Sequence, residues 1–122
     1  MEKFAICMPL SGEYFTTIRL TTGGLCALAG FDVDTAEDFK VCVTESLLIL
    51  KRNGYVSANV EFTVSETLGC SVVGNQKDDA AETKEESGLE DEISRSLLTA
   101  LLGDVTFVNG ANGKIEKIVF EG

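Results

Sequence analysis

Glu45 is the residue of this 122-residue chain that is best placed to do chemistry. It lies in the segment 43–55, VTESLLILKRNGY, whose pattern indicates the end of a largely apolar helix. A carboxylate in such surroundings can act as a general base if it reaches the proton to be removed and has a suitable pKa. It can equally be a structural group, paired with a backbone amide or with a base such as Arg52. The neighbouring residues have to decide between these two interpretations.

The helix that carries Glu45 is predicted from capping signals and apolar spacing. The segment 34–37, DTAE, is typical of a capping box and predicts the start of the helix. Asn53-Gly54 predicts its end. A preceding helix is predicted from Ser11 to Gly30, after a short strand at 4–8. The apolar stripe of the Glu45 helix consists of Phe39, Cys42, Val43, Leu47 and Leu50.

The second half of the chain predicts strands and one further helix. Apolar residues alternate with polar ones in the strand segments, and Ile93, Leu97, Ala100 and Leu101 follow helical spacing. We therefore expect an α+β two-layer sandwich, a single domain over residues 1–122, with three helices on one face of a mixed, mostly antiparallel sheet. The predicted elements are strands at 60–64 and 68–73, a helix at 93–102, and strands from 105 and at 115–120.

Acidic residues dominate the charge of the chain. The formal net charge is −10, and the segment 76–92 alone carries eight acids against two lysines. We expect this segment to be a lid-like loop that leads into the last helix. Such a surface repels phosphate backbones and anionic lipid, so it argues against nucleic-acid and membrane partners and favours a protein partner with a basic face. The acidity can alternatively serve solubility alone.

The four cysteines predict neither a metal site nor a disulfide framework. No CxxC pair and no histidine occurs, so a zinc site has few ligands to draw on. We expect Cys7, Cys26, Cys42 and Cys70 to be reduced and buried as small apolar residues. No apolar run reaches the roughly 18 residues of a membrane span, and the N-terminus lacks the features of a signal peptide. A cytoplasmic location is therefore expected.

Two motifs resemble the histidine-kinase-like ATPase fold, and within it the bacterial anti-sigma factor serine kinases. The segment 9–19, PLSGEYFTTIR, is similar to P-x-x-x-E-Y-x-x-x-I-R, and 43–55 is similar to V-x-E-A-x-x-N-A-x-x-H-G-Y without a gap. The resemblance implies that Glu45 stands at the general-base position. It also implies a sigma factor or an antagonist as partner, and a homodimer. Glu13, Tyr14 and Arg19 would contact the partner, although Arg19 can alternatively pair with a nearby acid.

The departures from the family pattern concern the nucleotide site. Ile49 replaces an asparagine that helps to hold magnesium, and its side chain has no oxygen to offer, so no metal ligand is expected there. Gly74 takes the place of the aspartate that recognises adenine. Gly88 alone remains of a glycine-rich phosphate turn, so any remnant nucleotide pocket would involve Glu45 and Gly88.

These departures predict a regulatory protein-binding domain that has lost catalysis, a pseudoenzyme without a cofactor. The alternative is a divergent ATP-dependent serine protein kinase or ATPase that uses ATP and magnesium, with Glu45 as its base. A pocket altered at Ile49 could also accept a small apolar molecule. Whether the protein is an enzyme therefore stays open at the level of the sequence.

Overall fold

The computed structural model describes residues 2–77, 87–102, 104–110 and 115–122. Within these ranges, five strands, three α-helices and one short 3-10 helix follow one another. Their order and bounds are β1 (Glu2–Pro9), η1 (Gly12–Tyr14), α1 (Phe15–Leu28), α2 (Val33–Arg52), β2 (Tyr55–Val64), β3 (Leu68–Lys77), α3 (Ser87–Leu102), β4 (Val105–Asn109) and β5 (Ile115–Glu121).

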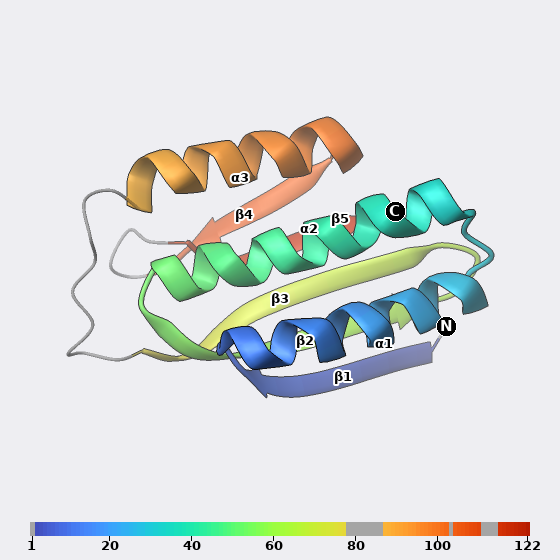
Figure 1. The fold of residues 1–122 in the computed structure, drawn as a ribbon, viewed down its shortest axis with the longest axis horizontal. Coiled ribbons are helices and arrows are strands. Elements are labelled where there is room, and N and C mark those ends of the chain that lie inside the picture. Colours follow the sequence, from blue (N-terminus) through green and yellow to red (C-terminus); the bar gives the residue numbers. More distant parts are fainter. Residues whose placement is uncertain (1, 78–86, 103, 111–114) are drawn as a thin grey trace.

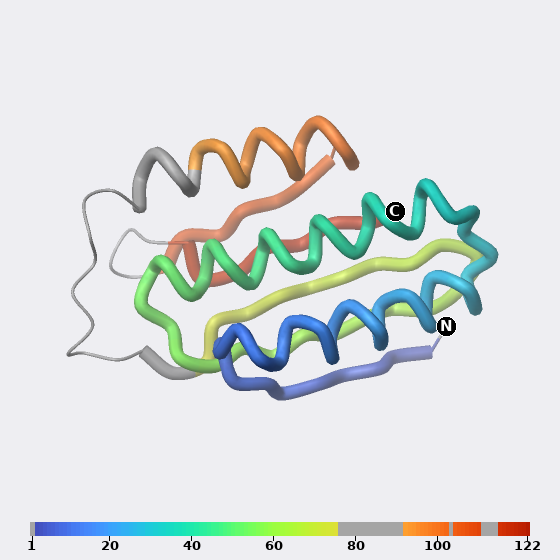
Figure 2. Tube along the Cα trace, in the orientation of Figure 1, coloured from blue at the N-terminus to red at the C-terminus, as the bar shows by residue number. Residues whose placement is uncertain are grey.

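The strands form one sheet in the order β1-β2-β3-β5-β4, and the three helices cover one face of it (Figure 1). Helix α2 lies between α1 and α3 (Figure 2). This arrangement confirms the α+β two-layer sandwich. All four strand pairings are antiparallel, so the described strands contain no parallel pair where a mixed sheet was predicted. The reason is topological: β3 and β4, which α3 connects, run in the same direction, but β5 lies between them.

The core lies between the sheet and the helices, and α2 contributes most of its helical side. The predicted apolar stripe of this helix is confirmed, since Phe39, Cys42, Val43, Leu47 and Leu50 are all fully buried. They face inward-pointing strand residues such as Val60, Phe62 and Ile118. Burial of one such large side chain contributes roughly 1.5–3 kcal/mol to folding. The central helix is therefore held rigidly over the sheet.

The ends of α2 are fixed by two polar side chains. The carboxylate of Asp32 accepts a hydrogen bond of 2.7 Å from the backbone N–H of Thr35. Hydrogen bonding by the Thr35 side chain, and then by this N–H, lowers the pKa of Asp32. The prediction that Asp34 caps the helix is therefore wrong, because the helix begins at Val33 and Asp34 already lies in its first turn. The predicted end is confirmed: the side-chain amide of Asn53 donates to the carbonyl of Ile49 at 2.6 Å, and Gly54 adopts a φ of 94°.

Helix α3 begins earlier and buries a different face than the sequence predicts. It starts at Ser87, within the segment 76–92 that was predicted as a loop, while β3 extends to Lys77 and residues 78–86 lie outside the described part of the chain. Ile93 and Leu97, predicted to be in the core, are 61% and 36% exposed, and Ala100 is exposed too. The buried residues are instead Ser94 and Leu98, about one position further along the helix. Because Ser94 is polar, a count of apolar residues does not reveal that the buried face of α3 contains Ser94 and Leu98.

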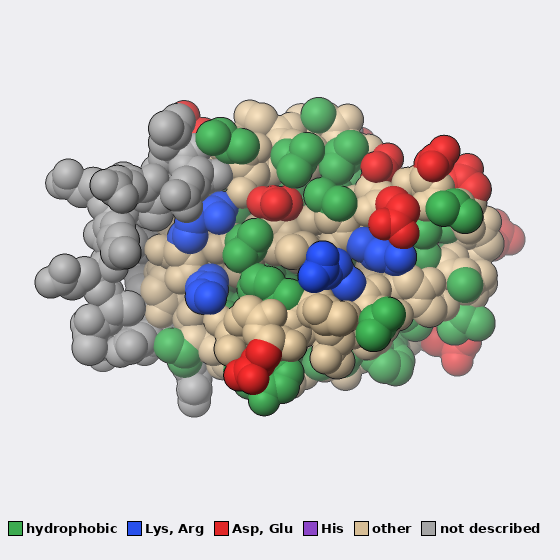
Figure 3. Space-filling model, in the orientation of Figure 1, with side chains coloured by type: hydrophobic (Ala, Val, Ile, Leu, Met, Phe, Trp, Pro, Cys, Tyr) green, Lys and Arg blue, Asp and Glu red, His purple; other side chains and the backbone are tan. Residues whose placement is uncertain are grey.

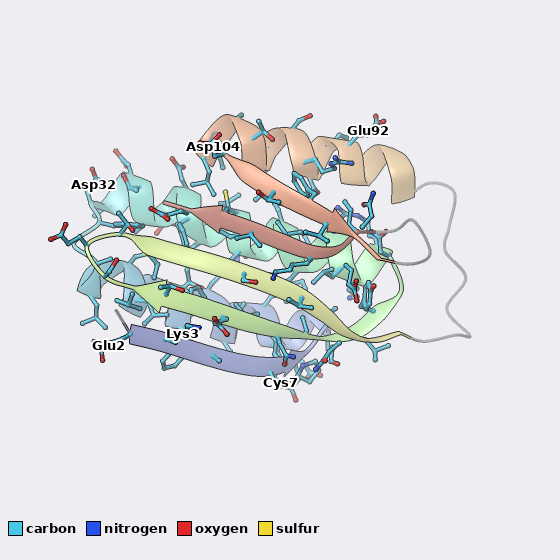
Figure 4. The ribbon with its side chains drawn as sticks, turned by 180° about the vertical axis from the view of Figure 1, so that it is seen from behind. Glu2, Lys3, Cys7, Asp32, Glu92 and Asp104 are labelled. Atoms are coloured by element: carbon cyan, nitrogen blue, oxygen red, sulfur yellow. The ribbon has the colours of Figure 1, made fainter. Side chains whose placement is uncertain are left out.

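Three of the four cysteines are buried as predicted, but Cys7 is exposed. It lies on β1, the edge strand of the sheet, as the view onto the uncovered face shows (Figure 4). Burial raises the pKa of the Cys42 thiol to about 12 and also raises the pKa of Cys26 and Cys70. The prediction for Cys7 is wrong because alternate residues of an edge strand point away from the helices.

We expect a thiol reagent at neutral pH to label one cysteine of the folded protein, Cys7, since the other three are buried and protonated. Mass spectrometry of the labelled protein, before and after addition of denaturant, measures the number of modified thiols. The Cys7→Ser variant should take up no label until it is unfolded. Rapid native-state labelling of Cys26, Cys42 or Cys70 would contradict the described packing.

Candidate functional site

The site is built around Glu45, which α2 presents to α3. The hydroxyl of Ser94 donates a hydrogen bond of 2.7 Å to Oε2 of Glu45. Nη2 of Arg52 donates to the same Ser94 oxygen, also at 2.7 Å. Glu45 and Arg52 are two helical turns apart and therefore share one face of α2. We call this group of three residues the Ser94 bridge.

In the Ser94 bridge, the hydrogen-bond partner of Glu45 is the hydroxyl of Ser94. Glu45 contacts neither a backbone amide nor Arg52 in these bonds; a serine hydroxyl lies between the two charged groups. Ser94 is only 3% exposed, so its hydrogen bonds form where water competes little. The proton that is hydrogen-bonded to the Glu45 carboxylate is therefore that of the Ser94 hydroxyl, a group of the same chain. The arrangement links α2 to α3 and compensates the burial of a hydroxyl.

Sequence reasoning missed Ser94. A signal was present, because Ser94 is four residues before the buried Leu98 and so lies on the same helical face. Serine carries no apolar weight in a periodicity count, so the more obvious Ile93 was placed in the core instead. Only the position of α2 shows that the hydroxyl has a carboxylate to bind.

The residues at the magnesium and adenine positions do not fit a magnesium nucleotide. The side chain of Ile49 is fully buried and offers no oxygen. At Gly74, a Cβ atom would lie 2.5 Å from Cγ and Cδ1 of Tyr55, whose ring is nearly buried, so an aspartate has no room. Gly88 lies in the first turn of α3. Among the described residues, no cluster of three or more cysteine or acidic side chains could hold a metal ion.

The three residues predicted to contact a partner are all exposed, Glu13 and Tyr14 on η1 and Arg19 on α1. Glu13 accepts a hydrogen bond of 3.1 Å from the hydroxyl of Ser11. Tyr14 is 43% exposed and lines a hollow of about 210 Å³ beside β1, together with Ile6, Cys7, Met8, Pro9, Thr17 and Ile18. Arg19 is exposed on α1 and makes no ion pair within the part of the chain that the structure describes. Leu28, the last residue of this helix, is also exposed.

No helix in the described ranges combines the length and the apolar character that crossing a membrane requires.

Three helices on one face of an antiparallel sheet, with Glu45 on the central helix, agree with the arrangement that the resemblance to the histidine-kinase-like ATPase fold predicts. The chain is 32% identical over 63 residues to the serine-protein kinases RsbW of Bacillus mycoides (strain KBAB4) and Bacillus cereus (strain B4264). It is 33% identical over 54 residues to the serine-protein kinase RsbW of Bacillus cereus (strain AH187). The resemblance to these kinases is thus confirmed for about half of the chain.

The match covers well under half of the length of each of these relatives. The aligned segments cover 52% and 44% of this chain, but only 39% and 34% of the length of the respective relatives. No protein-family model matches the chain.

Proposed function

We propose that this protein is an anti-sigma-like regulator that binds a protein partner, a sigma factor or its antagonist, and transfers no phosphate. Similarity to the RsbW kinases supports the regulatory class. The Ser94 bridge is the main observation that supports the proposed loss of catalysis, because a buried hydroxyl of the same chain is hydrogen-bonded to the Glu45 carboxylate. Glu13, Tyr14 and Arg19, exposed at the start of α1, are the proposed contacts to the partner.

Phosphoryl transfer consists mostly of positioning the phosphates and neutralising their charge, with metal ions as the main agents. The buried Ile49 replaces the expected magnesium ligand, and the ring of Tyr55 fills the space beside Gly74. A carboxylate base without a positioned phosphoryl group has no reaction to assist. The retained helices and sheet, in contrast, suffice to present a binding surface.

Calorimetric titration with ATP and magnesium tests the loss of the nucleotide site. We expect neither saturable heat nor a thermal shift at millimolar nucleotide, whereas an RsbW kinase run in parallel should give both. In a second arm, the sigma factors and antagonist proteins of the source organism are titrated against the labelled protein. Binding of none of them contradicts the regulatory function, and saturable nucleotide binding contradicts the absence of a cofactor.

A divergent ATP-dependent serine protein kinase is the second candidate. It is favoured by Glu45, which stays partly exposed despite its bond to Ser94, and by the kinase activity that the names of the relatives state. This candidate requires the Ser94 bridge to open so that Glu45 reaches a substrate hydroxyl. Phosphate transfer from ATP to a serine of the bound partner, abolished in Glu45→Ala, would establish it in place of our proposal.

A further inference from the structure

The cations of this acidic protein gather on its helical face. Four of the ten basic residues belong to α1 and α2, namely Arg19, Lys40, Lys51 and Arg52. In the space-filling view, Lys and Arg side chains lie along these two helices, and most of the acidic side chains on this face lie toward the right-hand side (Figure 3). The net charge of −10 therefore does not describe this face.

The packing of α1 against α2 fixes where three of these cations lie. The side chain of Lys40 crosses Gly23 of α1 so closely that a Cβ atom there would lie 2.9 Å from Cε of Lys40. Nζ of Lys51 lies 6.0 Å from the centre of the Phe15 ring. Arg19 is one helical turn from both Phe15 and Gly23, on the same face of α1. Lys51, Arg19 and Lys40 thus follow the seam between the two helices, and we call them the basic row.

The basic row is only partly neutralised by the chain itself. Lys40 forms an ion pair of 2.7 Å with Glu37, one turn earlier on the same helix. Arg19 and Lys51 are exposed and make no ion pair within the described ranges. Like charges held along one seam repel each other, and an anion placed over them relieves this repulsion. In a chain with 20 acids and 10 bases, such a row favours an anionic ligand.

We propose that the basic row binds an acidic segment of the partner protein, a helix whose carboxylates are spaced one turn apart at i, i+4 and i+8. Four helical residues rise by about 6 Å, so this spacing matches the successive positions of Phe15, Arg19 and Gly23 on α1. Leu20, 74% exposed beside the row, offers an apolar contact to such a helix. The inference rests on the proposed regulatory function, and it reverses for this face the basic partner that the net charge suggests.

A short acidic helix fits this face better than a nucleic acid does. Acids close the row at both ends: Asp34, Glu37 and Asp38 lie in the first turns of α2, and Glu13 lies just before α1. A phosphate backbone that continues past the row would meet these carboxylates and the overall negative charge. A peptide helix with a few acids in its middle avoids both, and basic residues at its ends would gain from the flanking acids.

The test uses a labelled alanine-rich helical peptide with three glutamates spaced by four residues, and a second peptide with glutamine at the same positions. Two double variants carry equal charge changes: Arg19→Gln/Lys51→Gln in the basic row, and Lys3→Gln/Lys117→Gln in the sheet. Fluorescence anisotropy gives the dissociation constants, and circular dichroism checks the fold. We expect the basic-row variant to bind the glutamate peptide roughly fivefold to tenfold more weakly, and the sheet variant to match the wild type.

Further arms separate the possible sources of binding. The wild type should bind the glutamine peptide far more weakly, and raising the salt from about 0.05 to about 0.3 M should weaken only the glutamate peptide. Equal losses in both double variants would overturn the proposal, as would no difference between the peptides. Tighter binding of a single-stranded oligonucleotide of matched charge would overturn it in favour of a nucleic-acid site.

A protein partner distinguishes this inference from the proposed function. If a sigma factor or an antagonist binds the wild type and the Arg19→Gln/Lys51→Gln variant equally, the regulatory function stands and the basic row is refuted. If neither kind of protein binds but the glutamate peptide still discriminates between the variants, the basic row stands and the regulatory function is refuted.

Discussion

Replacing Gly74 with aspartate, the residue found at this position in the nucleotide-binding family, should lower the free energy of unfolding by about 3 to 5 kcal/mol. A Cβ atom at Gly74 would lie 2.5 Å from two atoms of the Tyr55 ring, and that ring is only 9% exposed. The ring must be displaced, and the new carboxylate is placed beside it in the interior. Urea denaturation, followed by circular dichroism, measures the effect. This loss is a large fraction of the roughly 5–15 kcal/mol by which a domain is typically stable.

The same strand supplies the control. A Cβ atom at Gly69 would meet only Cβ of Thr63 at 3.7 Å and the carbonyl of Phe120 at 4.0 Å, which are ordinary contacts. Gly69→Ala should therefore change the stability by no more than about 0.5 kcal/mol, whereas Gly74→Ala should cost about 1–3 kcal/mol. The Tyr55→Ala/Gly74→Asp double variant should regain part of the loss. A stable Gly74→Asp single variant would show that the space beside Tyr55 is open after all.

Removal of the Ser94 hydroxyl should cost about 1–2 kcal/mol, because Ser94→Ala removes a nearly buried donor and leaves the partly exposed Glu45 carboxylate without this bond. The guanidinium of Arg52 loses an acceptor in the same variant. Ser96, exposed on the same helix, is the matched control, and Ser96→Ala should be neutral or slightly stabilising because alanine favours helix. Denaturation midpoints of both variants provide the measurement.

A double-mutant cycle between Ser94→Ala and Glu45→Ala shows whether Glu45 is structural. We expect a coupling energy of about 1 kcal/mol or more, since each residue loses its bond when the other is changed. Additive effects would mean that the bond contributes little, and Glu45 would then be free for another role. A Glu45→Ala variant that keeps its stability but loses nucleotide binding would favour the kinase interpretation over ours.

Structural contacts occupy three of the positions that the family resemblance assigns to the nucleotide site. Ser94 engages the carboxylate, Ile49 is part of the core, and the Tyr55 ring fills the space at Gly74. None of these changes disturbs the sheet or the packing of α1 on α2. Under the proposed function, the domain keeps the surface that a partner recognises while structural contacts occupy the positions of the nucleotide site.

Much of the fold could be predicted from the sequence. The apolar stripe of α2, its end at Asn53-Gly54 and the hairpin of β2 and β3 all follow from local spacing, because one helix or strand imposes its own period on the residues that it buries. The order of the predicted elements, with the motifs at 9–19 and 43–55, indicated the resemblance to the histidine-kinase-like ATPase fold. That Ile49 is no metal ligand stays a prediction, made from its side chain alone.

The tertiary structure decided the rest. Glu45 and Ser94 are 49 residues apart, and no local pattern tells that a hydroxyl of α3 binds a carboxylate of α2. The exposed edge position of Cys7, the ring over Gly74 and the seam that aligns Arg19 with two lysines also depend on packing between distant segments. The sequence determined the total charge of −10, but only the packing of α1 on α2 aligned Lys51, Arg19 and Lys40 in one row, since charge adds along a chain while its field depends on position in space.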